Sequence, residues 1–156
     1  MTAILAARVN GGILVGADRA WSDDEQILEC GPKIIRVGPW LLACAGEITC
    51  DWEALQEQDP RTPSDVSELL GTRSDVGAIL VRNRVLRVGG CSAGGAWQWG
   101  TVRGDAAIGS GAAWLRGAWD ALKGYEPDPE KRMRAALRVA ARRCPSVAGP
   151  FDVVWG

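Results

Sequence analysis

The sequence predicts a single α+β domain, residues 1–156, in which helices lie outside a pair of packed sheets. Strand-like apolar runs come first, short helical segments follow, strands return, longer helical segments come next, and a strand closes the chain. Separate blocks of strands and helices are typical of α+β layers, whereas strict alternation favours a parallel sheet. The 156 residues suffice for one domain with a substantial core, and no repeat, linker or low-complexity tract divides them.

Four apolar runs near the start are expected to form a four-stranded antiparallel meander over the first 45 residues. The first two runs are joined by Asn10-Gly11, a dipeptide that is the strongest short-range signal for a β-hairpin. The last two runs repeat this pattern around Gly38-Pro39. The four runs are residues 3–8, 12–17, 33–37 and 40–45.

Two short helices are expected after the meander. Thr49 or Asp51 can cap the first helix, because their side-chain oxygens can accept hydrogen bonds from its first backbone N–H groups. This helix extends to about Gln58 and is broken by residues 59–63. Residues 64–70 then form at most a short second helix.

Strands return in the second half, before two longer helices and a closing strand. Asp128-Pro129 starts the last helix, because Asp is a good N-cap and Pro suits the first helical position. The arginines of this helix are interpreted as a solvated or intersubunit face. The expected elements are strands at 76–82 and 84–89 turned at Asn83, a loop at 90–95, a strand at 96–103, helices at about 112–123 and 129–143, and a strand at 151–155.

Composition and charge limit the classes of function. A formal net charge of −1 and an apolar content of 47% argue against disorder and against a nucleic-acid partner. No window approaches the roughly 18 apolar residues of a membrane span. We find no secretory signal and no CxxC pair, so we expect a cytoplasmic protein with free, mostly buried thiols. The five cysteines are Cys30, Cys44, Cys50, Cys91 and Cys144.

The sequence contains no histidine. This absence excludes Ser-His-Asp and Cys-His catalysis, and it excludes the usual zinc sites, in which imidazole is a ligand. A hydrolase built on this chain must therefore take its base from a lysine, a carboxylate or a terminal amine. We expect no cofactor and no metal.

Thr2 stands directly behind Met1, at the start of the first strand-like run. Removal of Met1 would place a hydroxyl and an α-amine on this one residue. A free α-amine titrates near pH 8, so it can accept the hydroxyl proton while the oxygen attacks a carbonyl and forms an acyl-enzyme. Such a site also needs a cation, a carboxylate that positions the cation, and backbone N–H groups for the oxyanion.

The sequence offers a candidate for each of these roles. Asp18 ends the second strand and Lys33 opens the third, and strands of one sheet can place both beside the start of the first strand. Gly46 follows the fourth strand just before the first helix, where backbone amides point outward. Ser110, in AIGSG, lies at another strand-to-helix turn.

The order of these motifs resembles the proteasome β-subunits, and most of all the HslV-type bacterial proteasome; both are N-terminal nucleophile (Ntn) hydrolases. The resemblance extends from Thr2 to the final helix and implies a four-layer αββα sandwich, with two antiparallel sheets between helices. The motifs that carry it are Thr2, GAD at 16–18, PKIIRV at 32–37, CAGE at 44–47 and IGSG at 108–111. The implied roles are nucleophile for Thr2, the aspartate and lysine of the site for Asp18 and Lys33, the oxyanion amide for Gly46 and the GSG serine for Ser110.

Three features depart from the family pattern. Arg142 and Arg143 stand where the family often has an acidic residue, although Ser146 matches a serine that the family places nearby. The second central helix is shortened to residues 64–70, and the central helices contribute to ring contacts in the relatives. Glu47 follows the oxyanion glycine, where the relatives have a small residue, and a carboxylate there would disfavour a developing oxyanion.

The main hypothesis is a cytoplasmic threonine peptidase that self-associates into a ring and cleaves peptide or protein substrates. The resemblance adds an ATP-dependent unfoldase as a candidate partner; neither nucleic acid nor membrane is expected as a partner. Two alternatives stay open. One is a non-catalytic ring or scaffold protein of the same fold, which the three departures favour, and the other is an amidase of the same superfamily that acts on a small molecule.

Overall fold

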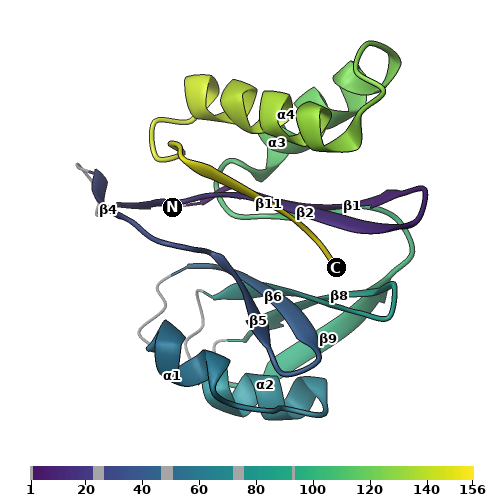
Figure 1. The fold of residues 1–156 in the computed structure, drawn as a ribbon. Helices are drawn as coiled ribbons and strands as arrows, with labels where there is room; N and C mark the ends of the chain where they lie inside the picture. Colours follow the sequence, from purple (N-terminus) through teal and green to yellow (C-terminus); the bar gives the residue numbers. More distant parts are fainter. Residues whose placement is uncertain (1, 23–26, 47–50, 72–75, 93) are drawn as a thin grey trace.

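Two antiparallel sheets lie face to face between two layers of helices, which confirms the predicted α+β sandwich (Figure 1). The structure is a computed structural model, and it describes residues 2–22, 27–46, 51–71, 76–92 and 94–156. Helices α3 and α4 cover the first sheet, and helices α1 and α2 cover the second.

The first sheet contains both ends of the chain, in the strand order β10-β1-β2-β11. Its side chains alternate between two cores, because successive residues of a strand point to opposite faces. On β1, Ile4 and Ala6 face the second sheet, whereas Leu5 and Ala7 face the helices. The four strands are β1 (Ile4–Val9), β2 (Gly12–Asp18), β10 (Ala106–Ile108) and β11 (Phe151–Trp155).

The second sheet is a meander of five consecutive strands, in the order β5-β6-β7-β8-β9. The five strands are β5 (Ile34–Val37), β6 (Trp40–Ala45), β7 (Gly77–Arg82), β8 (Val85–Cys91) and β9 (Trp97–Val102). A separate two-stranded hairpin, β3 (Ala20–Ser22) and β4 (Ile27–Cys30), precedes this sheet in the chain.

The expectation of one four-stranded meander in the first 45 residues is wrong. Both predicted hairpins form, but they belong to different sheets. The first hairpin takes its remaining neighbours from the far end of the chain, because β10 pairs with β1 and β11 pairs with β2. The strand β10 was not expected, and β8 extends to Cys91, into residues 90–95 that were expected to be a loop.

The helices follow the sequence expectations closely at their starts. Asp51 caps the first helix and Asp128 caps the last one, because the side-chain oxygen of each accepts hydrogen bonds from backbone N–H groups of the first turn. Thr49, the alternative cap, lies outside the described residues. In the described part of the chain, no helix has the length and apolarity to cross a membrane. The helices are α1 (Trp52–Gln56), α2 (Pro63–Leu70), α3 (Ala112–Ala121, continued by a 3-10 turn at Leu122–Gly124) and α4 (Pro129–Arg143).

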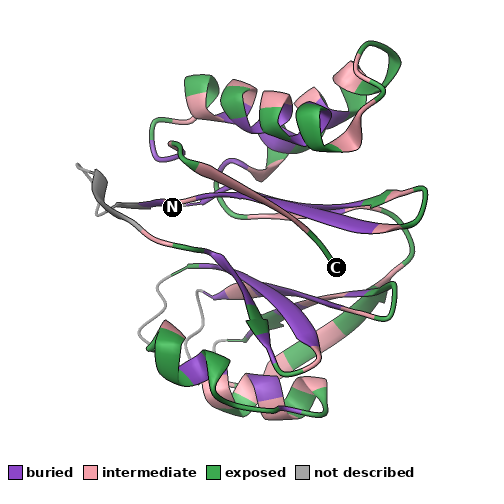
Figure 2. Cartoon of the chain, viewed as in Figure 1, coloured by how far each residue is buried: buried purple, intermediate pink, exposed green. Residues whose placement is uncertain are grey.

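Three apolar cores hold the four layers together. One lies between the sheets, one lies between the first sheet and α3 and α4, and the third lies between the second sheet and α1 and α2. Figure 2 shows that the buried residues gather on the inner sides of the helices, while exposed residues gather on the outer sides. Helix α4 packs closely because Gly16 has no side chain: a Cβ there would lie 2.4 Å from Cγ of the buried Met133.

A capping box at the start of α2 makes stability depend on pH. The Thr62 hydroxyl accepts a hydrogen bond from the Asp65 N–H at 3.2 Å, while the Asp65 carboxylate accepts from Thr62 Oγ1 at 2.7 Å and from the Thr62 N–H at 2.8 Å. The side-chain hydrogen bond from Thr62 and the backbone hydrogen bonds from Thr62 and Arg61 lower the pKa of Asp65. A lowered folded-state pKa adds stability above the unfolded-state pKa, and this stability is lost as the pH falls through the folded-state pKa.

We therefore expect Asp65→Asn to destabilise the protein at neutral pH and to lose this effect as the solution is made acidic. Urea unfolding of wild type and variant over a series of pH values measures the difference. Glu68→Gln, on the same helix, is the matched control for the removal of one carboxylate. A destabilisation by Asp65→Asn that stays the same from neutral to acidic pH would contradict the role of the ionised carboxylate.

Candidate active site

Thr2 is buried, with 4% of its surface exposed, and the turn between β10 and α3 encloses it. Its carbonyl oxygen accepts a hydrogen bond from the Gly111 N–H at 3.1 Å, and its backbone N donates to Ser110 Oγ at 3.3 Å. Gly109 has a φ of +90°, and a Cβ at this position would lie 2.1 Å from the Thr2 carbonyl oxygen. The IGSG turn therefore needs a glycine at 109 to come this close to the N-terminal strand.

Asp18 and Lys33 form a buried ion pair next to Thr2. Lys33 Nζ lies 2.9 Å from Asp18 Oδ2, and the side chains are 1% and 0% exposed. The carboxylate also accepts the N–H of Ala3 at 2.8 Å and that of Ala20 at 3.2 Å. Three donors thus replace the water that this carboxylate loses on burial. Because one of these donors is the N–H of the residue after Thr2, the ion pair holds the start of β1 in place.

The two members of this pair come from different sheets. Asp18 ends β2 of the first sheet, whereas Lys33 directly precedes β5 of the second sheet, and its carbonyl oxygen accepts the N–H of Cys44 at 3.1 Å. The expectation that strands of one sheet would bring them together is wrong. The structure brings them together across the space between the sheets, at the ends of two facing strands.

Two hydroxyls and a thiol form a group beside the Thr2 backbone nitrogen. Ser110 Oγ lies 3.4 Å from Ser146 Oγ and 3.9 Å from Cys144 Sγ, and Cys144 Sγ lies 3.3 Å from Ser146 Oγ. Sequence reasoning gave Cys144 no role in the site; its only signal was its position two residues before Ser146. Arg142 and Arg143, which replace the acid of the family pattern, are exposed at the end of α4. The group beside Thr2 therefore consists of uncharged hydroxyls and a thiol.

Gly46 directly follows β6 and is exposed, with a φ of +111°. The strand β6 ends on the side of the sandwich where the chain begins (Figure 1). Among the described residues, Gly46 does not belong to the hydrogen-bonded group around Thr2. Glu47, the residue that could oppose an oxyanion, lies outside the described residues.

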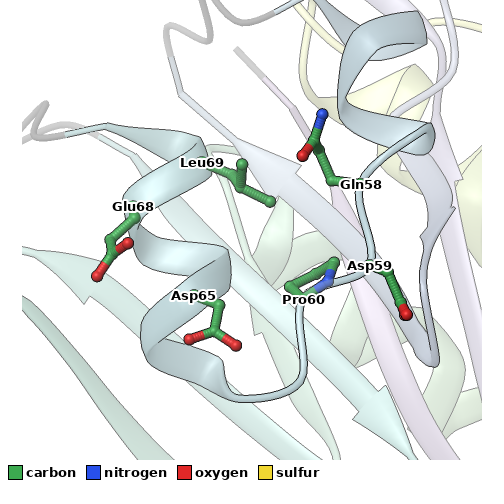
Figure 3. A pocket seen from close by; sticks show the side chains of 6 residues that line it. All are labelled: Gln58, Asp59, Pro60, Asp65, Glu68 and Leu69. Atoms are coloured by element: carbon green, nitrogen blue, oxygen red, sulfur yellow. The ribbon is translucent and has the colours of Figure 1, made fainter.

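A pocket of about 250 Å³ lies far from this group, on the outer helical layer that covers the second sheet (Figure 3). Its lining residues come from the α1–α2 connection and from α2: Gln58, Asp59, Pro60, Asp65, Glu68 and Leu69. The chemistry of Thr2, Asp18 and Lys33 is therefore not located in this pocket. In the described part of the chain, no three His, Cys, Asp or Glu side chains gather as metal ligands would.

We expect Gly109→Ala to destabilise the protein by roughly 2–4 kcal/mol, because the new methyl group meets the Thr2 carbonyl and the φ angle is unfavourable for alanine. Gly117→Ala is the matched control, since a Cβ there has no atom within 4 Å and the position lies within α3. Alanine is expected to add up to about 1 kcal/mol at that helical position. Urea unfolding compares the two variants, and equal stability would mean that the turn is not tight around Thr2.

We expect Lys33→Met to cost about 3–5 kcal/mol of unfolding free energy, because it leaves the Asp18 carboxylate buried without its cation. Asp152→Asn is the control, since it removes an ion pair with Arg19 that is 3.5 Å long and has side chains 27% and 33% exposed. Such a partly exposed pair is worth about 1 kcal/mol or less. Denaturant unfolding measures the free energy of unfolding of both variants. Similar decreases would show that the buried Asp18–Lys33 pair contributes no more to stability than the partly exposed pair.

Comparison with known proteins identifies similar structures. No family model and no curated protein sequence matches the chain. BPH from Thiobacillus denitrificans in complex with epoxomicin matches with a TM-score of 0.76 and 18% identity, over 98% of this chain and 97% of that chain. A second structure of the same BPH matches with a TM-score of 0.73 and 20% identity, over 98% and 96% of the two chains.

Eukaryotic HslV from Trypanosoma brucei matches with a TM-score of 0.70 and 22% identity, over 98% of both chains. At such identities the similarity shows the fold. The resemblance seen in the sequence is thereby confirmed for the architecture: this chain has the fold of HslV and of Thiobacillus denitrificans BPH.

Proposed function

We propose that the chain is a threonine-type N-terminal nucleophile hydrolase that cleaves peptides, with Thr2 as the nucleophile after removal of Met1. The observation that carries this proposal is the fixation of the Thr2 backbone on both sides. Ser110 Oγ lies 3.3 Å from the nitrogen that would become the α-amine, and the buried Asp18–Lys33 pair holds the N–H of Ala3. A chain without histidine needs another base, and this arrangement offers a terminal amine for that role.

In the proposed reaction, Thr2 Oγ1 attacks the carbonyl carbon of a peptide bond, and its proton passes to the α-amine. The N–H of Gly46 is the proposed donor to the oxyanion of the tetrahedral intermediate. Collapse of this intermediate breaks the C–N bond, and the leaving amine takes the proton from the α-ammonium. A water molecule then hydrolyses the threonine ester, which releases the acid and restores the hydroxyl.

The charged and polar neighbours have separate roles in this proposal. The Lys33 ammonium favours negative charge on the attacking oxygen and disfavours a second positive charge on the amine. Asp18 positions this ammonium and the start of β1. Ser110 Oγ accepts a hydrogen bond from the Thr2 nitrogen. Ser146 and Cys144 orient the Ser110 hydroxyl, a role that falls to them because the acidic residue of the family pattern is absent.

The proposal includes assembly and location. The HslV-like fold supports ring-forming self-association, with an ATP-dependent unfoldase as the proposed partner and peptide or protein chains as substrates. Cys91 and Cys144, which form no disulfide with a described residue, suit a reducing cytoplasm, which is the proposed location.

The second candidate function is a non-catalytic scaffold with the same fold. Its support is the exposed Arg142 and Arg143, together with the uncharged group beside Thr2 that stands where the family pattern has an acid. The third candidate, an amidase for a small molecule, keeps the same nucleophile and differs only in the size of its substrate.

We expect intact-mass spectrometry of the purified protein to show a chain that lacks Met1 and gains one adduct after incubation with epoxomicin. An epoxyketone selects such a site because it offers one electrophilic carbon to a hydroxyl and a second one to an amine on the same residue. Thr2→Ala should abolish the adduct, and Lys33→Met should slow its formation by about a hundredfold or more.

Cys144→Ser is the matched control, because Cys144 is a nearby thiol that an electrophile can alkylate. We expect this variant to keep the adduct. Retention of Met1 in all molecules, or no adduct on protein that lacks Met1, would favour the scaffold. Adduct formation with a small β-lactone but no cleavage of any peptide would favour the amidase.

A further inference from the structure

No contact within the described chain accounts for the glycine at position 117, in the middle of α3. A Cβ there would meet no described atom within 4 Å, and the residue is exposed. By contrast, Gly16, Gly109 and Gly111 each have a close neighbour that a side chain would meet. Glycine inside a helix is less favourable than alanine, because it loses more backbone entropy on folding. The reason for Gly117 therefore lies outside the single chain.

Gly117 belongs to an exposed apolar strip on α3, in the outer layer that covers the first sheet (Figure 1). Residues three and four apart lie on the same side of a helix, and all members of the strip are exposed. Trp114 is 51% exposed, and tryptophan is a residue that protein interfaces bury at their centre. The α3 strip consists of Ala113, Trp114, Gly117 and Ala121.

The two charged residues of α3 have opposite signs and stand beside the α3 strip. Arg116 and Asp120 are exposed and one helical turn apart, and neither forms an ion pair with a described residue. Residues 112–143 together have eight basic and four acidic residues, a net charge of +4. None of this surplus comes from α3 itself, which has one base and one acid. A contact limited to α3 therefore brings together no excess of like charge.

We infer that the α3 strips of two copies of this chain pack against each other as antiparallel helices related by a two-fold axis. In such a contact, the residues before the centre meet those that follow the centre in the other copy. A centre at residues 117–118 places Trp114 over Ala121 of the partner subunit and Arg116 beside Asp120 of the partner subunit. The large indole thus meets a small side chain, opposite charges meet at the rim, and the helices come closest at Gly117.

This contact is closed, because it uses the same surface on both copies and leaves none free for a third. It is compatible with the proposed ring, since a ring combined with two-fold contacts gives a closed assembly of two rings. The inference rests on the self-association included in the proposed function. It does not use the chemistry proposed for Thr2.

Sedimentation velocity of the full chain tests the contact through the mass of the assembly. We expect Trp114→Ala and Gly117→Leu each to halve this mass. Leucine adds apolar surface and favours a helix, so it would strengthen unspecific apolar association, whereas it blocks the close approach of two helices. Val85→Ala is the matched control, because Val85 is 38% exposed and lies at the start of β8, on the other sheet. We expect this control to keep the mass of wild type.

A charge swap tests the antiparallel orientation. Arg116→Glu alone places like charges beside each other and should weaken association about tenfold, because the two-fold axis repeats the pair. Addition of Asp120→Arg to this variant restores opposite charges and should recover the mass of wild type.

Thermal unfolding of each variant shows whether it is folded. Folded Trp114→Ala and Gly117→Leu variants with the mass of wild type would overturn the inference, and so would a monomeric wild type. A wild-type dimer that these variants convert to monomers would uphold the α3 contact and refute the ring. Failure of epoxomicin labelling would refute the proposed hydrolase and leave the α3 contact untouched.

Discussion

The buried contact between Asp18 and Lys33 is the interaction on which the rest of the structure depends. It joins the end of a strand in one sheet to the start of a strand in the other, at a place where neither charge reaches water. Burying two charges is unfavourable unless hydrogen bonds replace their hydration, and here the N–H groups of Ala3 and Ala20 complete the surroundings of the carboxylate. The same contact therefore closes one end of the sandwich and fixes the backbone next to Thr2.

The ion pair holds the backbone on one side of Thr2, and the turn at residues 109–111 holds it on the other side. Gly109 and Gly111 have no side chains to keep this turn away from β1, and the Gly111 N–H binds the Thr2 carbonyl at 3.1 Å. Ser110, between them, then meets the Thr2 nitrogen with its hydroxyl. Thr2 is thus held at its nitrogen and at its carbonyl, so that its orientation depends on backbone geometry more than on packing of its own small side chain.

The sequence was most informative where the cause is local. The Asn10-Gly11 turn, the caps Asp51 and Asp128 and the strand-to-helix turn at Ser110 depend on neighbouring residues, and all of them form as predicted. Membership of a sheet depends on partners far along the chain. The short β10 and the closing β11 are those partners for the first hairpin, and nothing in residues 3–17 indicates them.

The candidate site shows the same limit. Asp18 and Lys33 were expected to meet through neighbouring strands of one sheet, and they meet although they belong to two sheets. The order of the motifs along the chain indicated that Asp18 and Lys33 meet, since this order reflects the whole fold. An expectation based on neighbouring strands takes account only of adjacent segments. Cys144 was missed because a single cysteine has no spacing pattern, and only the path of the chain after α4 brings its thiol to Ser110 and Ser146.

The division into layers explains how this chain keeps the fold of HslV and BPH at 18–22% identity. Cores accept many apolar side chains of suitable volume, so packing between sheets and helices restricts residue class more than identity. The outer faces of the helices are under no such restriction, and here the α3–α4 segment and the α1–α2 segment have net charges of opposite sign. The Asp18–Lys33 ion pair, by contrast, is buried between the sheets. The surroundings of Thr2 and the charged outer faces of the helices therefore lie in different layers, and a substitution on an outer face can change the surface charge without disturbing the residues that surround Thr2.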